Sequence, residues 1–538
     1  MNNHNLSRLA VRHYQGALKV THLFLFLVAV TYTTVRAQNL KLEEIKNIIA
    51  KNYTDSVNDS AIMAAAIRGI MQSLDPYSEY LSPDEYQRMQ DRFHPGTSMG
   101  IGIGVTSSHD TITVFRVKAF SPADKVGILP GDRIITIGKE NAIGFSWQES
   151  LDKLANPTFE GKVEMTIYRP EGGKLMLVDV TPRELPAEKK IVWQMLNDTT
   201  GYMRFAIFSD NINADVHAGI LALEKLGMRS LVLDLRDNSG GLVREAAAIA
   251  KEFVGGNSKL FTLSGKTAES KGTYYANDKA PFEKLPLTLL VDDGTASASE
   301  LLAGALQDLD RAFIIGSPTY GKSMVQNLYP LGNGGALKLT SARAYLPSGR
   351  LMQRRYNGAS YLSERFIFDS VEDNYDHKSE APSVSKQYRP FLTFYGRKVF
   401  GGQGIIPDYL IPQGVLHPST ERLFNENIIL DFAMQYLPYH AAGLKEEFTM
   451  NNFMSDFHAP KTMISDLALL AKECRIEIDP KELVLDRERI EHAFAIQLAY
   501  QLFGDEAWRM PDPGKDSALA LALSHQSQAQ KMSELADK

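Results

Sequence analysis

The sequence has one cysteine, Cys474, among its 538 residues, and this scarcity excludes several kinds of site. A single cysteine cannot form an intramolecular disulfide or a cysteine-rich zinc site. The chain also lacks an excess of basic charge, because 58 lysines and arginines face 64 aspartates and glutamates. The resulting net charge of -6 does not indicate a nucleic-acid-binding surface.

The first 37 residues contain no acidic side chain and no apolar run long enough to span a membrane. Basic residues precede the short apolar run Leu23–Val30, and small residues lead up to Ala37. This order is typical of a secretory signal peptide and predicts cleavage after Ala37. An uncleaved anchor is the alternative, although a membrane span needs about 20 apolar residues. We expect an exported protein of the periplasm or cell envelope, where a chain without disulfides relies on its core.

The segment from 94 to 185 is rich in short strand-like stretches, as in a small β-rich domain, and we expect two short helices between them, one that begins at Ser121-Pro122 and one that begins with a capping box at Ser146. In GIGI, residues 100–103, Gly100 and Gly102 can leave backbone N–H groups free for a peptide carboxylate, while Ile101 and Ile103 line a pocket. A strand softened by glycine is the alternative. The following SPADKVGILPGDRIITI, residues 121–137, resembles protease-associated PDZ domains, and this favours a peptide-binding PDZ domain.

Beyond residue 185, buried strands alternate with helices. LVLDL (231–235) and LTLLV (287–291) have little polar alternation, which is typical of strands covered on both faces. The pattern predicts an α/β layer with right-handed crossovers. We therefore divide the chain into a signal peptide (1–37), an N-terminal helical segment (38–93), a PDZ domain (94–185), an α/β core (186–353 and 401–415), an insertion (354–400) and a C-terminal helical region (416–538).

The stretch GSPTYGKSMVQ, residues 316–326, matches the nucleotide-binding pattern G-x-x-x-x-G-K-[ST]. A working phosphate loop needs a helix that starts at its Lys and Ser, because the helix N-terminus binds the phosphates. Only seven residues separate Lys322 from Pro330, and glycines follow. We predict that no helix starts there, and an NTPase remains only as an alternative.

GTASASE, residues 294–300, lies between a buried strand and a helix, where a nucleophile can be exposed beside helix-end N–H groups. Ser297 is the candidate, and a plain capping box with Glu300 is the alternative. Histidine is scarce as a base, since His217 is the only one between residues 190 and 350. A buried lysine can serve instead, which makes Lys322 the candidate base, with Gln326 placed to orient its amine.

Four stretches together resemble the C-terminal processing peptidases, which are serine proteases with a PDZ domain and a Ser-Lys dyad. They are LDPYSEYL (74–81), LVLDLRDNSGGLV (231–243), GTASASELLAGALQD with PTYGKSMVQ (294–308 and 318–326), and YLPSGR with GIIPD (345–350 and 404–408). The resemblance implies a crotonase-like α/β protease core with an inserted PDZ domain. Residues 354–400 and the chain from about 416 onward have no counterpart that we recognise.

The resemblance also implies roles for single residues. Ser297 would be the nucleophile, Lys322 the general base and Gln326 its support. The backbone N–H groups of Ala298 and of Gly240, or else Gly241, would form the oxyanion hole.

The same resemblance implies a substrate and excludes cofactors. Protein or peptide C-termini would bind through GIGI and be cut without a metal or other cofactor. Arg169 would take part in gating by the PDZ domain, with a plain surface charge as the alternative. An envelope adaptor or a second copy of the chain is a further expected partner. The alternative is a PDZ scaffold that binds C-termini without cleaving them.

Overall fold

The computed structural model describes residues 41–94, 99–108, 111–145, 153–154, 161–185, 190–357, 360–361, 390–411, 416–504, 507, 514 and 516–535. The expected signal peptide, the PDZ helix expected after Ser146 and most of the insertion lie outside these residues. Within the described residues, no helix is long and apolar enough to cross a membrane. The chain forms two units, of which the first holds the described residues up to Pro83 together with Leu328–Leu339.

The first unit contains a helix over residues 41–52, helix α2 (Asp59–Gln72) and strand β1 (Glu79–Leu81). Asn58 caps α2 by accepting hydrogen bonds from the N–H groups of Ser60 and Ala61. Asp75 then holds the turn before β1, since its Oδ1 accepts from Tyr77 N and Ser78 N at 2.8 Å. Within the expected N-terminal helical segment (38–93), strand β1 follows α2 and pairs antiparallel with β18 (Ala336–Tyr345), a pairing that the sequence analysis did not predict.

The PDZ domain is an antiparallel sheet in the order β3-β4-β5-β7-β8, with β6 paired to β5. Its short helix α4 (Pro122–Lys125) begins as predicted, because Ser121 caps it by accepting from Asp124 N. Buried isoleucine and valine side chains form most of the hydrophobic core of the domain. The strands are β2 (Met99–Gly100), β3 (Ile103–Ser108), β4 (Thr111–Val117), β5 (Arg133–Ile137), β6 (Glu140–Asn141), β7 (Val163–Arg169), β8 (Lys174–Val180) and β9 (Arg183–Glu184).

The α/β core is built on a six-stranded sheet in the order β10-β11-β12-β15-β16-β23, parallel except for the β10–β11 pair. Every residue of β12, β15 and β16 is buried, as the apolar runs predict. The bounds are β10 (Ile191–Met195), β11 (Thr200–Phe205), β12 (Ser230–Asp234), β15 (Leu287–Val291), β16 (Phe313–Gly316) and β23 (Tyr409–Leu410).

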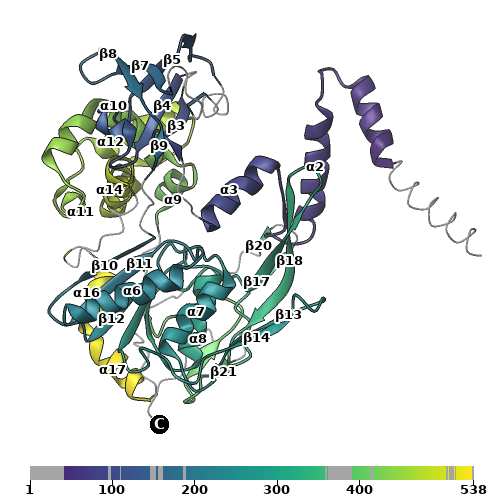
Figure 1. The fold of residues 1–538 in the computed structure, drawn as a ribbon, viewed down its shortest axis with the longest axis vertical. Coiled ribbons are helices and arrows are strands. Elements are labelled where there is room, and N and C mark those ends of the chain that lie inside the picture. Colours follow the sequence, from purple (N-terminus) through teal and green to yellow (C-terminus); the bar gives the residue numbers. More distant parts are fainter. Residues whose placement is uncertain are drawn as a thin grey trace, which may run out of the picture. The chain divides into compact units, whose positions relative to one another are not determined.

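Helices cover both faces of this sheet (Figure 1). Helices α6 (Ile212–Lys225), α7 (Val243–Phe253) and α8 (Ala298–Asp308) cover one face, where Leu231 and Leu289 are buried. The other face, with Val232 and Leu290, is covered by α16 (Ser517–Ser524) and α17 (Gln526–Leu535). Because side chains alternate between the faces of a strand, the two sets of helices bury different residues of the same strands.

A second sheet joins β13 (Lys259–Gly265) to β14 (Gly272–Tyr275) and to β18. Strand β17 (Met324–Pro330) and β18 form a hairpin around residues 332–335. The described parts of the expected insertion (354–400) contain short strands. These are β19 (Tyr356–Asn357), β20 (Ser360–Tyr361), β21 (Pro390–Leu392) and β22 (Lys398–Phe400).

The C-terminal region is helical as predicted, and residues 416–504 form a core of their own. This helical bundle contacts the PDZ domain. Arg116 of β4 lies over the ring of Tyr500, 4.7 Å from its centroid, and donates to its hydroxyl. The helices are α9 (Pro418–Asn425), α10 (Ile428–Glu447), α11 (Phe453–Asp456), α12 (Met463–Glu473), α13 (Pro480–Leu485) and α14 (Arg487–Phe503).

Arg350, the last residue of YLPSGR, is fully buried and fixes the C-terminal end of α8. Its guanidinium donates to Gln307 Oε1 at 2.7 Å and to the carbonyl oxygen of Phe400 at 2.9 Å. It also forms an ion pair with the buried carboxylate of Asp308 at 2.8 Å. One side chain thus joins α8, the YLPSGR turn and β22.

We expect Arg350→Met to lower the free energy of unfolding by about 3–5 kcal/mol, because it leaves the Asp308 carboxylate buried without its cation. Urea unfolding measures the change. Arg343→Met, an exposed position on β18, is the matched control and should cost less than about 0.5 kcal/mol. Equal effects of the two substitutions would contradict the role given to Arg350.

Candidate active site

Ser297 lies at the turn from β15 into α8 and has an unusual backbone conformation, with φ 58° and ψ −114°. A serine that only caps a helix has an extended backbone with negative φ. Non-glycine residues rarely adopt positive φ, and such strain is concentrated at functional sites. The turn therefore has the character of a nucleophile elbow, in which the strained conformation exposes the side chain.

The predicted capping residue Glu300 has a larger part than a cap. Its fully buried carboxylate accepts a hydrogen bond from the N–H of Ser297 at 2.8 Å and from the N–H of Lys322 at 2.8 Å, both on Oε2. The backbone nitrogens of Ser297 and Lys322 are therefore separated by at most twice that distance. Oε1 accepts from Thr319 Oγ1 at 2.6 Å and from Gly321 N at 2.7 Å.

The charge state of Glu300 depends on these contacts. Burial raises the pKa of the Glu300 carboxyl, while the hydrogen bonds from Thr319, Lys322, Gly321 and Ser297 act in the opposite direction, and the net pKa is raised. Four neutral donors thus stabilise a carboxylate that has been removed from water. The sequence showed Glu300 only as a partner in a capping box.

Lys322 belongs to the loop of residues 317–323, which we call the lysine loop. The loop ends where β17 begins at Met324, so no helix starts at Lys322 or Ser323, as predicted. Ser323 uses its N–H to donate to Gln353 Oε1 at 2.9 Å, and its Oγ accepts from Met352 N at 3.0 Å. The geometry that a phosphate loop requires is not present, which removes the basis for an NTPase.

Gln326 lies on β17, partly buried. Its amide nitrogen donates to the carbonyl oxygen of Met324 and to Thr340 Oγ1, both at 3.1 Å. With the amide N–H groups used in this way, the side-chain oxygen is the atom with which Gln326 can accept a hydrogen bond from a lysine amine. The support of Lys322 by Gln326 remains a prediction.

The NSGG sequence lies in the loop between β12 and α7, residues 235–242, which we call the glycine loop. Gly240, with φ 97°, lies against the Ser297 turn, because a Cβ on it would be 2.8 Å from Ser297 Cβ and 2.9 Å from Ala298 N. Only glycine permits this approach. The glycine loop and the Ser297 turn are therefore in close contact.

The candidate oxyanion donors differ in their present contacts. Among the described residues, the N–H groups of Ala298 and Gly241 donate no hydrogen bond, whereas the N–H of Gly240 donates to Asn238 Oδ1 at 3.0 Å. The N–H of Gly240 would have to break its hydrogen bond to Asn238 in order to donate to an oxyanion. The roles of Ala298 and Gly240 remain predictions, and the contact with Asn238 favours Gly241 over Gly240.

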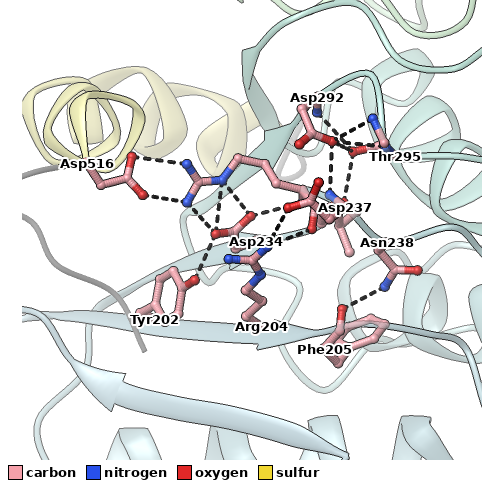
Figure 2. A network of polar contacts seen from close by, with 12 residues as sticks. Tyr202, Arg204, Phe205, Asp234, Asp237, Asn238, Asp292, Thr295 and Asp516 are labelled. Atoms are coloured by element: carbon pink, nitrogen blue, oxygen red, sulfur yellow. Dashed lines mark hydrogen bonds and ion pairs between the residues drawn. The ribbon is translucent and has the colours of Figure 1, made fainter. Parts of the chain in front are cut away.

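A network of charged and polar side chains lies at the start of the glycine loop (Figure 2). The buried Asp234 accepts from Arg236 and from the hydroxyl of Tyr202, at 2.6 Å and 2.8 Å. Burial alone would raise the pKa of Asp234, but the charges of Arg236 and Arg204 outweigh it and hold the pKa at about 2. Asp234 is thus a permanent anion that anchors the start of the loop.

A second carboxylate ties the glycine loop to the turn before Ser297, residues 292–297, which we call the serine loop. Asp292 Oδ1 accepts from Asp237 N at 3.0 Å, and also from Gly294 N and Thr295 N at 3.1 and 3.0 Å. Arg204 donates to Asp237 Oδ2 at 3.0 Å. Burial and the nearby charge of Asp237 raise the pKa of Asp292 to about 7.

The predicted peptide-binding residues lie at the β2–β3 junction of the PDZ domain. Gly102 has φ 84°, and a Cβ there would be 2.2 Å from Ser121 Cβ, so the position requires glycine. Gly100 pairs with Arg183, Ile101 is buried in the domain core, and Ile103 packs against that core from a partly buried position. Residues 101 and 102 interrupt the strands, so the interpretation as one softened strand is wrong. Peptide binding here remains a prediction.

Arg169 is not the plain surface charge that we considered as its alternative. Its Nε and Nη2 donate to the two oxygens of Asp132 at 2.7 Å, and Nη2 also donates to the carbonyl oxygen of Gly127. The hydrogen bond to Asp132 raises the pKa of Arg169. Arg169 holds a turn of the PDZ domain, and its part in gating remains a prediction.

The comparisons with known proteins agree with this architecture. Residues 199–358 match the model of Peptidase family S41, residues 99–181 match the PDZ domain, and residues 420–504 match a family of unknown function. The fold and the first match define a serine-type peptidase with an α/β core and an inserted PDZ domain.

Relatives make the classification more specific. The chain is 31% identical to a carboxy-terminal-processing protease of Bartonella bacilliformis, over 61% of this chain and 77% of that protein. It is 28% identical to the carboxy-terminal processing protease CtpB of Bacillus subtilis, over 59% of this chain and 65% of that protein. The solved photosystem II D1 C-terminal processing protease is 24% identical, with a TM-score of 0.35, and the match covers 70% of this chain and 88% of that one. The chain belongs to the carboxy-terminal-processing protease family.

We expect Glu300→Gln to slow the reaction of Ser297 with a fluorophosphonate probe and to lower the free energy of unfolding by more than about 2 kcal/mol. If the new NH₂ group replaces Oε2, it faces the N–H groups of Ser297 and Lys322, and if it replaces Oε1, it faces the N–H of Gly321, so at least one hydrogen bond to a charged acceptor is lost in either orientation. Probe labelling and urea unfolding measure the two effects. Glu224→Gln, on the exposed face of α6, should change neither. Reduced stability with unchanged labelling would show that Glu300 supports the fold without aligning the serine loop with the lysine loop.

The raised pKa of Asp292 predicts a pH dependence of stability. The folded chain holds a proton on Asp292 up to about pH 7, whereas the unfolded chain releases it near 3.8. Stability should therefore fall as pH rises between these values, by up to about 1.4 kcal/mol per pH unit from this group, and level off above them. Asp292→Asn should remove this slope in urea unfolding at several pH values, while the exposed Asp278→Asn should retain it. Parallel slopes for Asp292→Asn and wild type would contradict the assignment.

Proposed function

We propose that this chain is an exported serine endopeptidase that binds protein C-termini through its PDZ domain and cleaves peptide bonds with Ser297 and Lys322. The observation that carries the proposal is the pair of hydrogen bonds on Glu300 Oε2, which accepts from the backbone N–H of both residues at 2.8 Å. The strained conformation of Ser297 supports the choice of nucleophile.

In the proposed reaction, Lys322 acts in its neutral form and takes the hydroxyl proton as Ser297 Oγ attacks the substrate carbonyl. The N–H of Ala298 and that of a glycine in the glycine loop stabilise the negative charge on the carbonyl oxygen, and removing one such donor typically costs about 3 kcal/mol. Lys322 then gives the proton to the leaving amine, and water hydrolyses the acyl-enzyme by the same route. Gln326 orients the lysine amine through its side-chain oxygen.

The PDZ domain supplies the substrate class. We place the terminal carboxylate of the substrate at the loop around Gly102, because a free C-terminus is the ligand that this kind of domain takes. The names of the relatives state processing at the carboxy terminus, and we extend that specificity to this chain. The basic, apolar and small residues up to Ala37 support export.

We expect the purified protein to cleave a substrate that carries a disordered, apolar C-terminal tail with a free carboxylate. Ser297→Ala and Lys322→Ala should each reduce cleavage by at least about a thousandfold, because the nucleophile and its base act as a unit. The exposed Lys266→Ala should leave the rate unchanged. Gel electrophoresis and mass spectrometry follow the products.

The same substrate with an amidated C-terminus separates recognition from chemistry. Slower cleavage of the amide supports capture of the carboxylate by the PDZ domain. Binding of the tail without cleavage by wild type would instead support the scaffold alternative, and equal cleavage by Lys322→Ala would contradict the role of the lysine.

A further inference from the structure

Asp516, at the N-terminus of α16, reaches the base of the glycine loop from 280 residues away in the sequence. Its two carboxylate oxygens accept from Arg236 Nη1 at 3.0 Å and from Nη2 at 2.6 Å, in a bidentate geometry (Figure 2). Both side chains are mostly buried, with 23% of Asp516 and 19% of Arg236 exposed. Bidentate pairs of this kind fix the orientation of the guanidinium as well as its position.

Arg236 connects Asp516 with the residues that shape the glycine loop. Its Nε and Nη2 donate to Asp234, so the guanidinium lies between two carboxylates. Its carbonyl oxygen accepts from Arg204 Nη2 at 3.1 Å, and the same nitrogen donates to Asp237. Asp237 adopts a positive φ of 57°, which requires the surrounding contacts to hold it.

From Asp237 the contacts continue to the serine loop. Asp237 N donates to Asp292, and the next residue, Asn238, accepts at its carbonyl oxygen from Ala296 N at 3.0 Å and from Ser299 Oγ at 2.8 Å. The two residues after Arg236 therefore contact the chain on both sides of Ser297. A shift of Arg236 would be transmitted to both loops.

The segment that carries Asp516 is anchored in its own right. Leu519, Ala522, Ala529 and Met532 of α16 and α17 are buried against the sheet face that includes Val232 and Leu290. This segment lies outside the three regions that match family models, which end at residue 504. The tail thus brings a carboxylate to the peptidase core that the matched regions do not contain.

We propose that Asp516 is a positioning residue, through which the C-terminal helices α16 and α17 set the conformation of the glycine and serine loops. The inference rests on the proposed function, because it takes Ser297 as the nucleophile. The carboxylate is required for this role, because an amide at the same position has a single acceptor oxygen and would turn its NH₂ group toward the second guanidinium N–H.

Asp516→Asn tests the charge while keeping the helix cap. Asp516 Oδ1 also caps α16 by accepting from Leu519 N, and asparagine caps equally well. We expect kcat for the tailed substrate to fall by about tenfold with KM unchanged, since a small displacement of catalytic groups slows the chemical step. Hydrogen exchange of the amides in residues 236–241 should become faster, and Asp516→Glu should restore part of kcat.

Asp479→Asn is the matched control, because Asp479 caps α13 by accepting from Lys481 N at an exposed site. It should leave kcat and hydrogen exchange at wild-type values. Wild-type kcat in Asp516→Asn, or a fall in Tm with normal activity of the folded protein, would overturn the proposal. Persistent cleavage by Ser297→Ala would instead overturn the proposed function, so the two failures are distinguishable.

Discussion

The Glu300 carboxylate is the constraint on which the site depends. One oxygen accepts from the backbones of both the nucleophile and the base candidate, and the other holds the loop that leads to Lys322. A carboxylate buried at this depth is stable only with its hydrogen bonds complete. The serine loop and the lysine loop must therefore both contact Glu300 when its carboxylate is buried. Because Glu300 belongs to α8, the folding of this helix brings the backbones of Ser297 and Lys322 close together.

Neutral hydrogen-bond donors to Glu300 suit the proposed role of Lys322 as a base better than an ion pair with Glu300 would. The hydrogen bonds that stabilise the Glu300 carboxylate come from the backbone N–H groups of Ser297, Lys322 and Gly321 and from the hydroxyl of Thr319. A general base must give up its positive charge, so an ion pair between Glu300 and the Lys322 side chain would oppose the proposed chemistry. The contact between Lys322 and Glu300 is made through the lysine backbone N–H, and it positions the residue.

Short sequence patterns predicted the features that depend on residues near one another in the sequence. The apolar runs gave β12 and β15, and the spacing before Pro330 correctly excluded a helix at Lys322. The partners of buried charges could not be predicted in this way. Asp516 binds Arg236, which lies 280 residues away in the sequence, and Arg350 contacts Asp308 and Phe400. No short stretch of sequence indicates that these residues are neighbours in the fold. Strand β1 was missed for the same reason, since its pairing partner is β18.

The apparent nucleotide motif has a physical origin in the turn that follows β16. Gly316 has φ 141°, and a Cβ there would lie 1.8 Å from the carbonyl oxygen of Val291, so β16 can end beside β15 only with glycine at this position. Gly321 has φ 90° where the chain turns into β17. A phosphate loop uses glycines to bring backbone N–H groups to an anion, and this loop uses two of its N–H groups, those of Gly321 and Lys322, in the same way. The anion is the chain's own Glu300, which explains why the pattern resembles a phosphate-binding loop while β17, rather than a helix, follows it.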